Sequence, residues 1–153
     1  MKSEQIIKSS IREELEENGR IIYSNVGDSM EPLIRQGRDL LVIERSDGRL
    51  KRFDIPLYQR EGSRRYVLHR ILKVREQDYV ICGDNRWNRE YGITDRQIVG
   101  VLTSIIRDGR ERPLSGFRYG LYLFFWCRLF PLRATILRGK AVIKKVLRKV
   151  IKR

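Results

Sequence analysis

Hydrophobic and polar residues recur along the chain with two different periods, which divide its first part into one helix and a series of strands. Ile6, Ile7, Ile11 and Leu15 recur at helical spacing, so a helix is predicted over Ser3–Asn18, with Gly19 at its C-terminal stop. Beyond it the period is two, and short apolar runs are separated by turn residues. The predicted strands cover residues 20–26, 39–45, 55–59, 66–75, 78–82 and 97–107. Strands without intervening helices predict a mainly β, α+β fold rather than a βαβ array.

The pattern changes again after Pro113. Residues 119–132 are apolar and aromatic, but as a helix they would measure only about 21 Å, against roughly 30 Å of hydrocarbon in a bilayer. A transmembrane span is therefore not expected. Residues 134–153 predict an amphipathic basic helix. Its apolar stripe is Ile136, Ile143, Val146, Leu147, Val150 and Ile151, and the residues off the stripe are Lys140, Lys144, Lys145, Arg148, Lys149 and Lys152.

Charge follows the same division. The 153 residues carry a net charge of +14, and residues 110–153 hold 13 of the 33 basic residues but one of the 19 acidic ones. A basic amphipathic helix after an aromatic segment predicts peripheral association with an anionic membrane surface. The alternative is a C-terminal helix that packs its apolar stripe on the body. No nucleic-acid-binding motif accompanies the charge, so no nucleic-acid partner is expected.

Cysteine and histidine usage excludes several classes of protein. Cys82 and Cys127 cannot form a disulfide-rich scaffold or a CxxC zinc site, and a single histidine rules out a multi-histidine metal centre. No metal or other cofactor is expected, and both cysteines are predicted to be buried. The first residues, Met1-Lys2-Ser3-Glu4-Gln5, show no apolar stretch typical of an export signal.

Two residues suggest acyl-transfer chemistry. Ser29 lies in Gly27-Asp28-Ser29-Met30-Glu31-Pro32, where a tight turn would expose the hydroxyl and aim backbone N–H groups at a developing oxyanion. His69, expected in the middle of strand 66–75, could act as the general base. The alternative for His69 is a packed core histidine. An acid to orient the imidazole would be Asp84, in Cys82-Gly83-Asp84-Asn85, or Glu90.

The order of these pieces resembles the type I signal peptidase family, in its Ser–His branch found in archaea, the endoplasmic reticulum and some Gram-positive bacteria. The resemblance rests on the Ser29 turn, Phe53-Asp54-Ile55, Tyr66-Val67-Leu68-His69-Arg70-Ile71, Gly83-Asp84-Asn85 and Ile98-Val99-Gly100-Val101, and it covers residues 24–107. Related bacterial enzymes and self-cleaving repressors carry Lys where this chain has His69.

The resemblance implies a serine endopeptidase with a signal-peptidase-like β-ribbon or barrel domain. Ser29 would be the nucleophile and His69 the general base, with Asp84 and Glu90 completing the site. The substrate would be an extended signal or leader peptide with small side chains at P1 and P3. The catalytic domain would comprise residues 1–112, and residues 113–153 would form a membrane-associating tail.

The chain departs from the family pattern at three points. Gly27 replaces a serine that helps to hold the oxyanion, so backbone N–H groups would do this, and Glu90 replaces a usual aspartate. A short polar helix also stands where the family has a transmembrane anchor. Two alternatives therefore remain: a non-catalytic membrane- or partner-binding module on a peptidase fold, and a self-cleaving, repressor-like regulator. Only 28 residues precede Ser29, too few for a helix-turn-helix domain of usual size, so the regulator ranks last.

Overall fold

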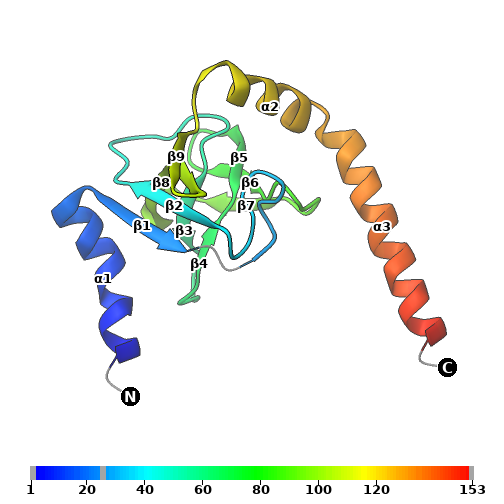
Figure 1. Cartoon of the computed structure of the whole chain (residues 1–153), viewed down its shortest axis with the longest axis horizontal. Helices are drawn as coiled ribbons and strands as arrows, with labels where there is room; N and C mark the ends of the chain where they lie inside the picture. The colour runs from blue at the N-terminus through cyan, green and yellow to red at the C-terminus, as the bar shows by residue number, and fades with distance from the viewer. Residues whose placement is uncertain (1–2, 25–26, 152–153) are drawn as a thin grey trace.

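The computed structural model describes residues 3–24 and 27–151, and shows a mainly β body flanked by a helix at each end of the chain (Figure 1). Helix α1 (Ser3–Asn18) leads into β1 (Arg20–Ser24), and Gly19 donates its N–H to the carbonyl of Leu15, which confirms the predicted helix end. Ile11 and Leu15 bury the helix against the body. The predicted strand end at residues 25–26 lies outside the described residues, as do residues 152–153 and the side chains of Ile6 and Ile7.

The larger of two antiparallel sheets has the order β1-β2-β8-β3-β4, with β9 also paired to β8. Its remaining strands are β2 (Asp39–Glu44), β3 (Pro56–Gln59), β4 (Tyr66–Leu68), β8 (Ile98–Arg107) and β9 (Arg110–Pro113). The long strand β8 pairs with β2 on one side, and with β3 and then β9 on the other. The first core cluster fills this sheet and contacts α1.

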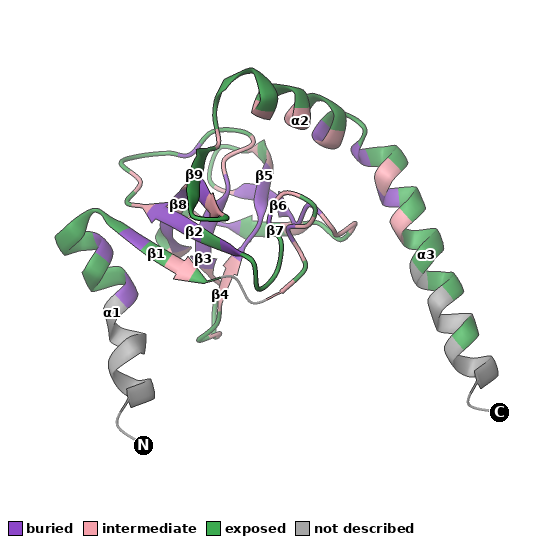
Figure 2. Ribbon diagram, viewed as in Figure 1, coloured by how far each residue is buried: buried purple, intermediate pink, exposed green. Residues whose placement is uncertain are grey.

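The smaller sheet contains β5 (Arg70–Val74), β6 (Tyr79–Cys82) and β7 (Glu90–Ile93), in that order. A short 3₁₀ helix, η1 (Asp95–Gln97), joins it to β8. A second core cluster lies between the sheets and includes Tyr58, Ile71 and Ile81, each fully buried. The fold is therefore a mixed α+β fold built mostly of strands, which confirms the coarse prediction (Figure 2).

The expectation of one continuous strand over residues 66–75 is wrong at His69. Strand β4 ends at Leu68 and β5 begins at Arg70, and the two strands belong to different sheets. His69 is thus the residue at which the chain crosses from one sheet to the other. Apolar residues continue on both sides of it, so the alternation pattern does not reveal the crossing.

The C-terminal part forms two helices, α2 (Gly116–Arg128) and α3 (Phe130–Ile151). No single helix in residues 3–24 and 27–151 is long and apolar enough to cross a bilayer, whereas Gly116–Arg128 and Phe130–Lys140 meet that test only as a pair bent by 64°. Helix α2 contacts the body, and α3 leaves it after Ala134, the last buried residue of the helix among those described (Figure 2). The domain boundary at residue 113 stays a prediction.

The described residues of the predicted apolar stripe do not pack on the body. Ile136, Ile143 and Leu147 are each at least half exposed. The side chains of Val146, Val150 and Ile151, and of the basic residues at positions 144, 145, 148 and 149, lie outside the described part of the chain. The alternative of a helix lying with its stripe on the body is therefore wrong for the described half of the stripe.

Candidate active site

Apolar side chains anchor the turn that carries Ser29 to the core of the protein. Gly27 has a φ of 137°, a conformation that favours glycine, as the sequence predicted. Met30 and Ile34 are buried in the first core cluster, and the Ile34 N–H donates to the Met30 carbonyl at 3.0 Å. Met30 is therefore a core residue rather than a substrate contact. With its neighbours fixed in this way, Ser29 lies half-buried at the surface of the turn.

The loop after β6 holds this turn from the other side. The Asn85 backbone N–H donates to the Ser29 carbonyl at 2.8 Å, and the Asn85 side-chain amide donates to the Asp28 carbonyl at 3.1 Å. Arg86 adds an ion pair with Asp28 at 2.5 Å. Two segments more than fifty residues apart in the chain are thus bound to each other at the candidate nucleophile.

The His69 imidazole and the Ser29 turn both lie next to Gly83. A Cβ atom built on Gly83 would lie 2.6 Å from the Ser29 carbonyl oxygen and 3.1 Å from His69 Cδ2. The Ser29 turn and the imidazole therefore both contact Gly83, and only a residue without a side chain fits between them. This contact explains the glycine in Gly83-Asp84-Asn85 by close approach.

Glu90 is the acid that contacts His69. The distance from His69 Nδ1 to Glu90 Oε1 is 2.9 Å, and the His69 side chain is only 10% exposed. An ionised carboxylate can only accept, so Nδ1 donates in this bond, and in the neutral imidazole Nε2 is then the nitrogen that carries the lone pair. The Nε2 atom neighbours Cδ2, on the edge of the ring that faces Gly83. This is the tautomer that a general base requires.

Two further side chains contact the His69–Glu90 pair, one a guanidinium and one a phenol. Arg60 donates to both carboxylate oxygens, at 2.7 and 2.8 Å, and the buried Tyr58 hydroxyl lies 3.3 Å from His69 Nδ1. Burial opposes ionisation of Glu90, but the hydrogen bonds from His69 and Arg60 outweigh it, so the pKa of Glu90 lies well below its usual range. Burial and the Glu90 charge raise the pKa of Tyr58, which remains a neutral phenol.

Asp84 has a different set of partners. It accepts from Arg70 Nε at 2.8 Å and Nη2 at 2.7 Å, and both side chains are almost completely buried. Burial lowers the pKa of Arg70, but the Asp84 carboxylate outweighs this and the pKa stays above its usual value. Of the two candidate acids, Glu90 contacts His69 and Asp84 pairs with Arg70.

Helix α2 completes the surroundings of Asp84. The Tyr122 hydroxyl donates to Asp84 Oδ2 at 2.8 Å, the Trp126 indole N–H donates to the Asp84 carbonyl at 3.1 Å, and Arg70 donates to the Tyr119 hydroxyl at 2.7 Å. Two tyrosines of the predicted tail therefore bond to a buried ion pair of the body, and a tryptophan bonds to the backbone of Asp84. Because Gly83 and Asn85 flank Asp84, α2 supports the loop that contacts Ser29.

Sequence reasoning did not find Arg60, Arg70 or Tyr58. Arg70 gave a signal, since a charged residue within an apolar run indicates a buried partner. Arg60 and Tyr58 gave none, because they meet the site only through strand pairing: β3 carries Tyr58 beside Val67 of β4.

The described residues contain no cluster of three metal-ligating side chains. Cys82 and Cys127 are both free and buried, as predicted. Burial raises the pKa of the Cys82 thiol to about 11, so it is not a thiolate nucleophile at neutral pH.

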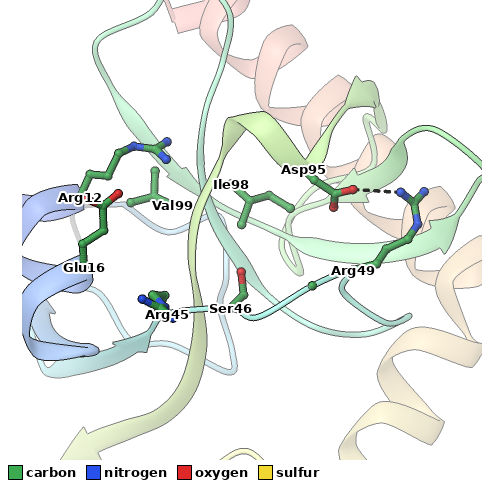
Figure 3. A pocket seen from close by; sticks show the side chains of 9 residues that line it. Arg12, Glu16, Arg45, Ser46, Arg49, Asp95, Ile98 and Val99 are labelled. Carbon is green, nitrogen blue, oxygen red and sulfur yellow. Dashed lines mark hydrogen bonds and ion pairs between the residues drawn. The ribbon is translucent and has the colours of Figure 1, made fainter.

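A separate cavity of about 360 Å³ lies between α1 and the segment after β2 (Figure 3). Arg12, Arg45 and Arg49 line it together with Glu16 and Asp95, so opposite charges largely balance. Arg49 bonds to Asp95 at 3.0 Å. None of the candidate catalytic side chains lines this cavity.

No protein-family model matches the chain, and no curated protein or solved structure matches it either. The likeness to signal peptidases therefore rests on the motifs of the sequence, and function must be argued from the geometry of the site.

Proposed function

We propose that this chain is a serine endopeptidase of the signal peptidase type, in which Ser29 is the nucleophile, His69 the general base and Glu90 the residue that orients it. One observation carries the proposal: the imidazole that Glu90 holds by Nδ1 at 2.9 Å turns its opposite edge towards the glycine that the Ser29 turn also contacts. A serine, an imidazole and a partly buried acid are the three groups of serine acyl transfer.

The reaction would proceed through an acyl-enzyme. Nε2 of His69 takes the hydroxyl proton as Ser29 Oγ attacks the scissile carbonyl carbon. The tetrahedral intermediate then collapses, the peptide C–N bond breaks, and the imidazolium gives its proton to the departing amine. A water molecule, deprotonated by the same imidazole, releases the new carboxyl group from Ser29.

The substrate would lie as an extended strand. Strands β1 and β4 are the two ends of the strand order in the larger sheet, so among the described residues each forms an edge. Strand β1 runs towards the Ser29 turn, and β4 ends immediately before His69. Tyr23 of β1 and Tyr66 of β4 both pack against the first core cluster. Main-chain bonding of a peptide at these edges suits a signal or leader peptide, and small P1 and P3 side chains are what the resemblance implies.

A serine-reactive acylating probe and a leader-bearing peptide test the proposal together. Ser29→Ala and His69→Ala should each abolish both labelling and cleavage without changing the circular dichroism spectrum. Ser46→Ala is the matched control, because Ser46 is also a half-buried serine outside the helices and strands, and it should behave as wild type. Cleavage by Ser29→Ala at the wild-type rate would show that the assignment is wrong.

A non-catalytic binding module is the second candidate. The observation that favours it is the ion pair between Arg60 and Glu90, since a carboxylate neutralised by a guanidinium stabilises an imidazolium less. The same probe distinguishes the two candidates: a folded wild-type chain with no labelling that depends on His69 would support the module.

A further inference from the structure

The outer face of helix α2 exposes large apolar side chains to an unusual degree. Phe117 is 80% exposed, Phe124 53% and Phe125 58%, and Leu121 lies beside them on the helix. A contiguous exposed aromatic surface generally marks an interaction site. Figure 2 shows this side of α2 as exposed along its length.

The apolar surface continues across the bend into α3. Leu129, Leu132 and Ile136 are each about half exposed or more, and Ile143 and Leu147 extend the row along α3. We refer to Phe117, Leu121, Phe124, Phe125, Leu129, Leu132 and Ile136 as the docking surface. It spans α2 and the first turns of α3.

Charge around the docking surface has one sign. Residues 112–153 contain 12 basic residues and no acidic one. Arg118 and Arg128 are exposed on α2, and the guanidinium of Arg128 lies 5.4 Å from the centre of the Phe124 ring. A second copy of the chain would bring the same positive charge against the surface, so self-association is disfavoured. An anionic surface fits both the apolar and the basic residues.

The inner face of α2 decides how the helix lies. Tyr119 and Tyr122 are bonded to the buried Arg70–Asp84 ion pair, and Trp126 is bonded to the Asp84 backbone carbonyl. Passage of α2 and α3 through a bilayer as a bent pair would withdraw these three side chains and leave a buried ion pair without its partners, which is costly. Lying in the plane of the interface keeps the inner contacts and buries the outer aromatic residues.

We propose that the docking surface binds anionic lipid, with α2 lying flat in the membrane interface and its inner face remaining on the body. The binding depends on exposed aromatic and basic residues and not on catalysis. It therefore holds for Ser29→Ala as for the wild type, and its failure would be distinct from a failure of the peptidase assignment.

Vesicle co-sedimentation of the full chain tests the binding. Vesicles of phosphatidylcholine mixed with phosphatidylglycerol should bind the protein, vesicles of phosphatidylcholine alone should not, and salt should weaken the binding. Phe124→Ser with Phe125→Ser should lower partitioning at least about tenfold. Arg118→Gln and Arg128→Gln should each lower it about fivefold. Leu40→Ser is the control, because Leu40 is 43% exposed on β2 outside the docking surface.

Depth measurements test the flat orientation. Brominated lipids should quench a tryptophan introduced by Phe124→Trp, more strongly with bromine near the headgroups than at the bilayer centre, and should not quench one introduced by Leu40→Trp. Failure of the folded protein to bind mixed vesicles would overturn the proposal. Binding without quenching at position 124 would overturn it in favour of adsorption by the basic end of α3, and quenching strongest at the centre would overturn it in favour of a bent span.

Discussion

Replacement of Gly83 by alanine tests the contact on which the proposed function depends. The new Cβ would lie 2.6 Å from the Ser29 carbonyl oxygen and 3.1 Å from both His69 Cδ2 and Arg86 Cγ. The oxygen is backbone and its turn is anchored by Met30 and Ile34 in the core, so no flexible side chain can relieve the overlap.

The size of the effect follows from these distances. Ordinary contacts begin at 3.4 Å, so the turn and the loop must separate by about 0.8 Å, and a displacement approaching 1 Å costs about 100-fold in rate. The strain also costs about 1–3 kcal/mol of folding free energy. We therefore expect Gly83→Ala to fold with reduced stability and to react with an acylating probe about two orders of magnitude more slowly than wild type.

Two other glycines provide matched controls. Gly100→Ala would place a Cβ 2.7 Å from Ile43 Cγ2 and 2.8 Å from the Glu44 carbonyl oxygen, in the core away from Ser29. It should lose stability to a similar extent yet keep its acylation rate. Gly120 in α2 has nothing within 4 Å of a built Cβ, so Gly120→Ala should gain up to about 1 kcal/mol.

Single-turnover acylation and urea denaturation separate the two effects. If Gly83→Ala acylates within roughly threefold of wild type while Gly100→Ala is destabilised as expected, Gly83 does not separate a working Ser29 and His69, and the reasoning fails.

Three further measurements test the roles of the acids. Glu90→Gln should slow acylation about 10- to 100-fold, since a charge-assisted hydrogen bond contributes about 1.5–3 kcal/mol; an unchanged rate would show that Glu90 does not act on His69. Asp84→Asn leaves Arg70 buried without a counter-ion and should cost about 3–5 kcal/mol in urea denaturation, and a change near zero would contradict the importance of the pair. Because folding lowers the pKa of Glu90 from its ordinary value of 4.5, the contribution of Glu90 to stability is complete at higher pH and is lost as the pH falls below that value. The difference in melting temperature between wild type and Glu90→Gln should therefore shrink on acidification, and a constant difference down to about pH 3 would be inconsistent with a lowered pKa.

Apolar periodicity was sufficient for the elements that bury one face. Helix α1 and the strands at 20, 39, 56, 79 and 98 begin within a residue or so of their predicted positions. Strands β7 and β9 were not predicted. Strand β9 is exposed throughout, and Ile93 is the one buried residue of β7, so neither strand shows an alternating apolar pattern. Both strands form by pairing with a neighbour, β7 with β6 and β9 with β8. For β9 a local signal existed: Asp108-Gly109, both with positive φ, forms a tight turn that typically joins two strands.

Motif spacing could not predict which acid contacts His69, since Asp84 and Glu90 lie only six residues apart on one loop and strand. Strand register decides between them. Arg70 of β5 pairs with Cys82 of β6, which brings its side chain to Asp84, and Ile81 pairs with Glu90 of β7. Register follows from the packing of both sheets and the bulges within them, and neither can be read from a local pattern.

The position of Asp84 shows that the basic C-terminal segment begins with a helix attached to the body. The net charge of the chain gathers in residues 110–153, which suggests a tail independent of the body, but Tyr119, Tyr122 and Trp126 tie its first helix to the buried Arg70–Asp84 pair. Aromatic residues with a polar group suit this place: the Tyr119 and Tyr122 rings lie against the Arg70 guanidinium and their hydroxyls bond to the ion pair, while the Trp126 indole N–H donates to the Asp84 backbone carbonyl. The residues between them on the helix surface, Phe124 and Phe125, have no polar group and face outward. Helix α2 therefore faces a buried ion pair on one side and the proposed lipid on the other. Its tyrosines and tryptophan, which carry a polar group, lie on the first side, and Phe124 and Phe125, which carry none, lie on the second.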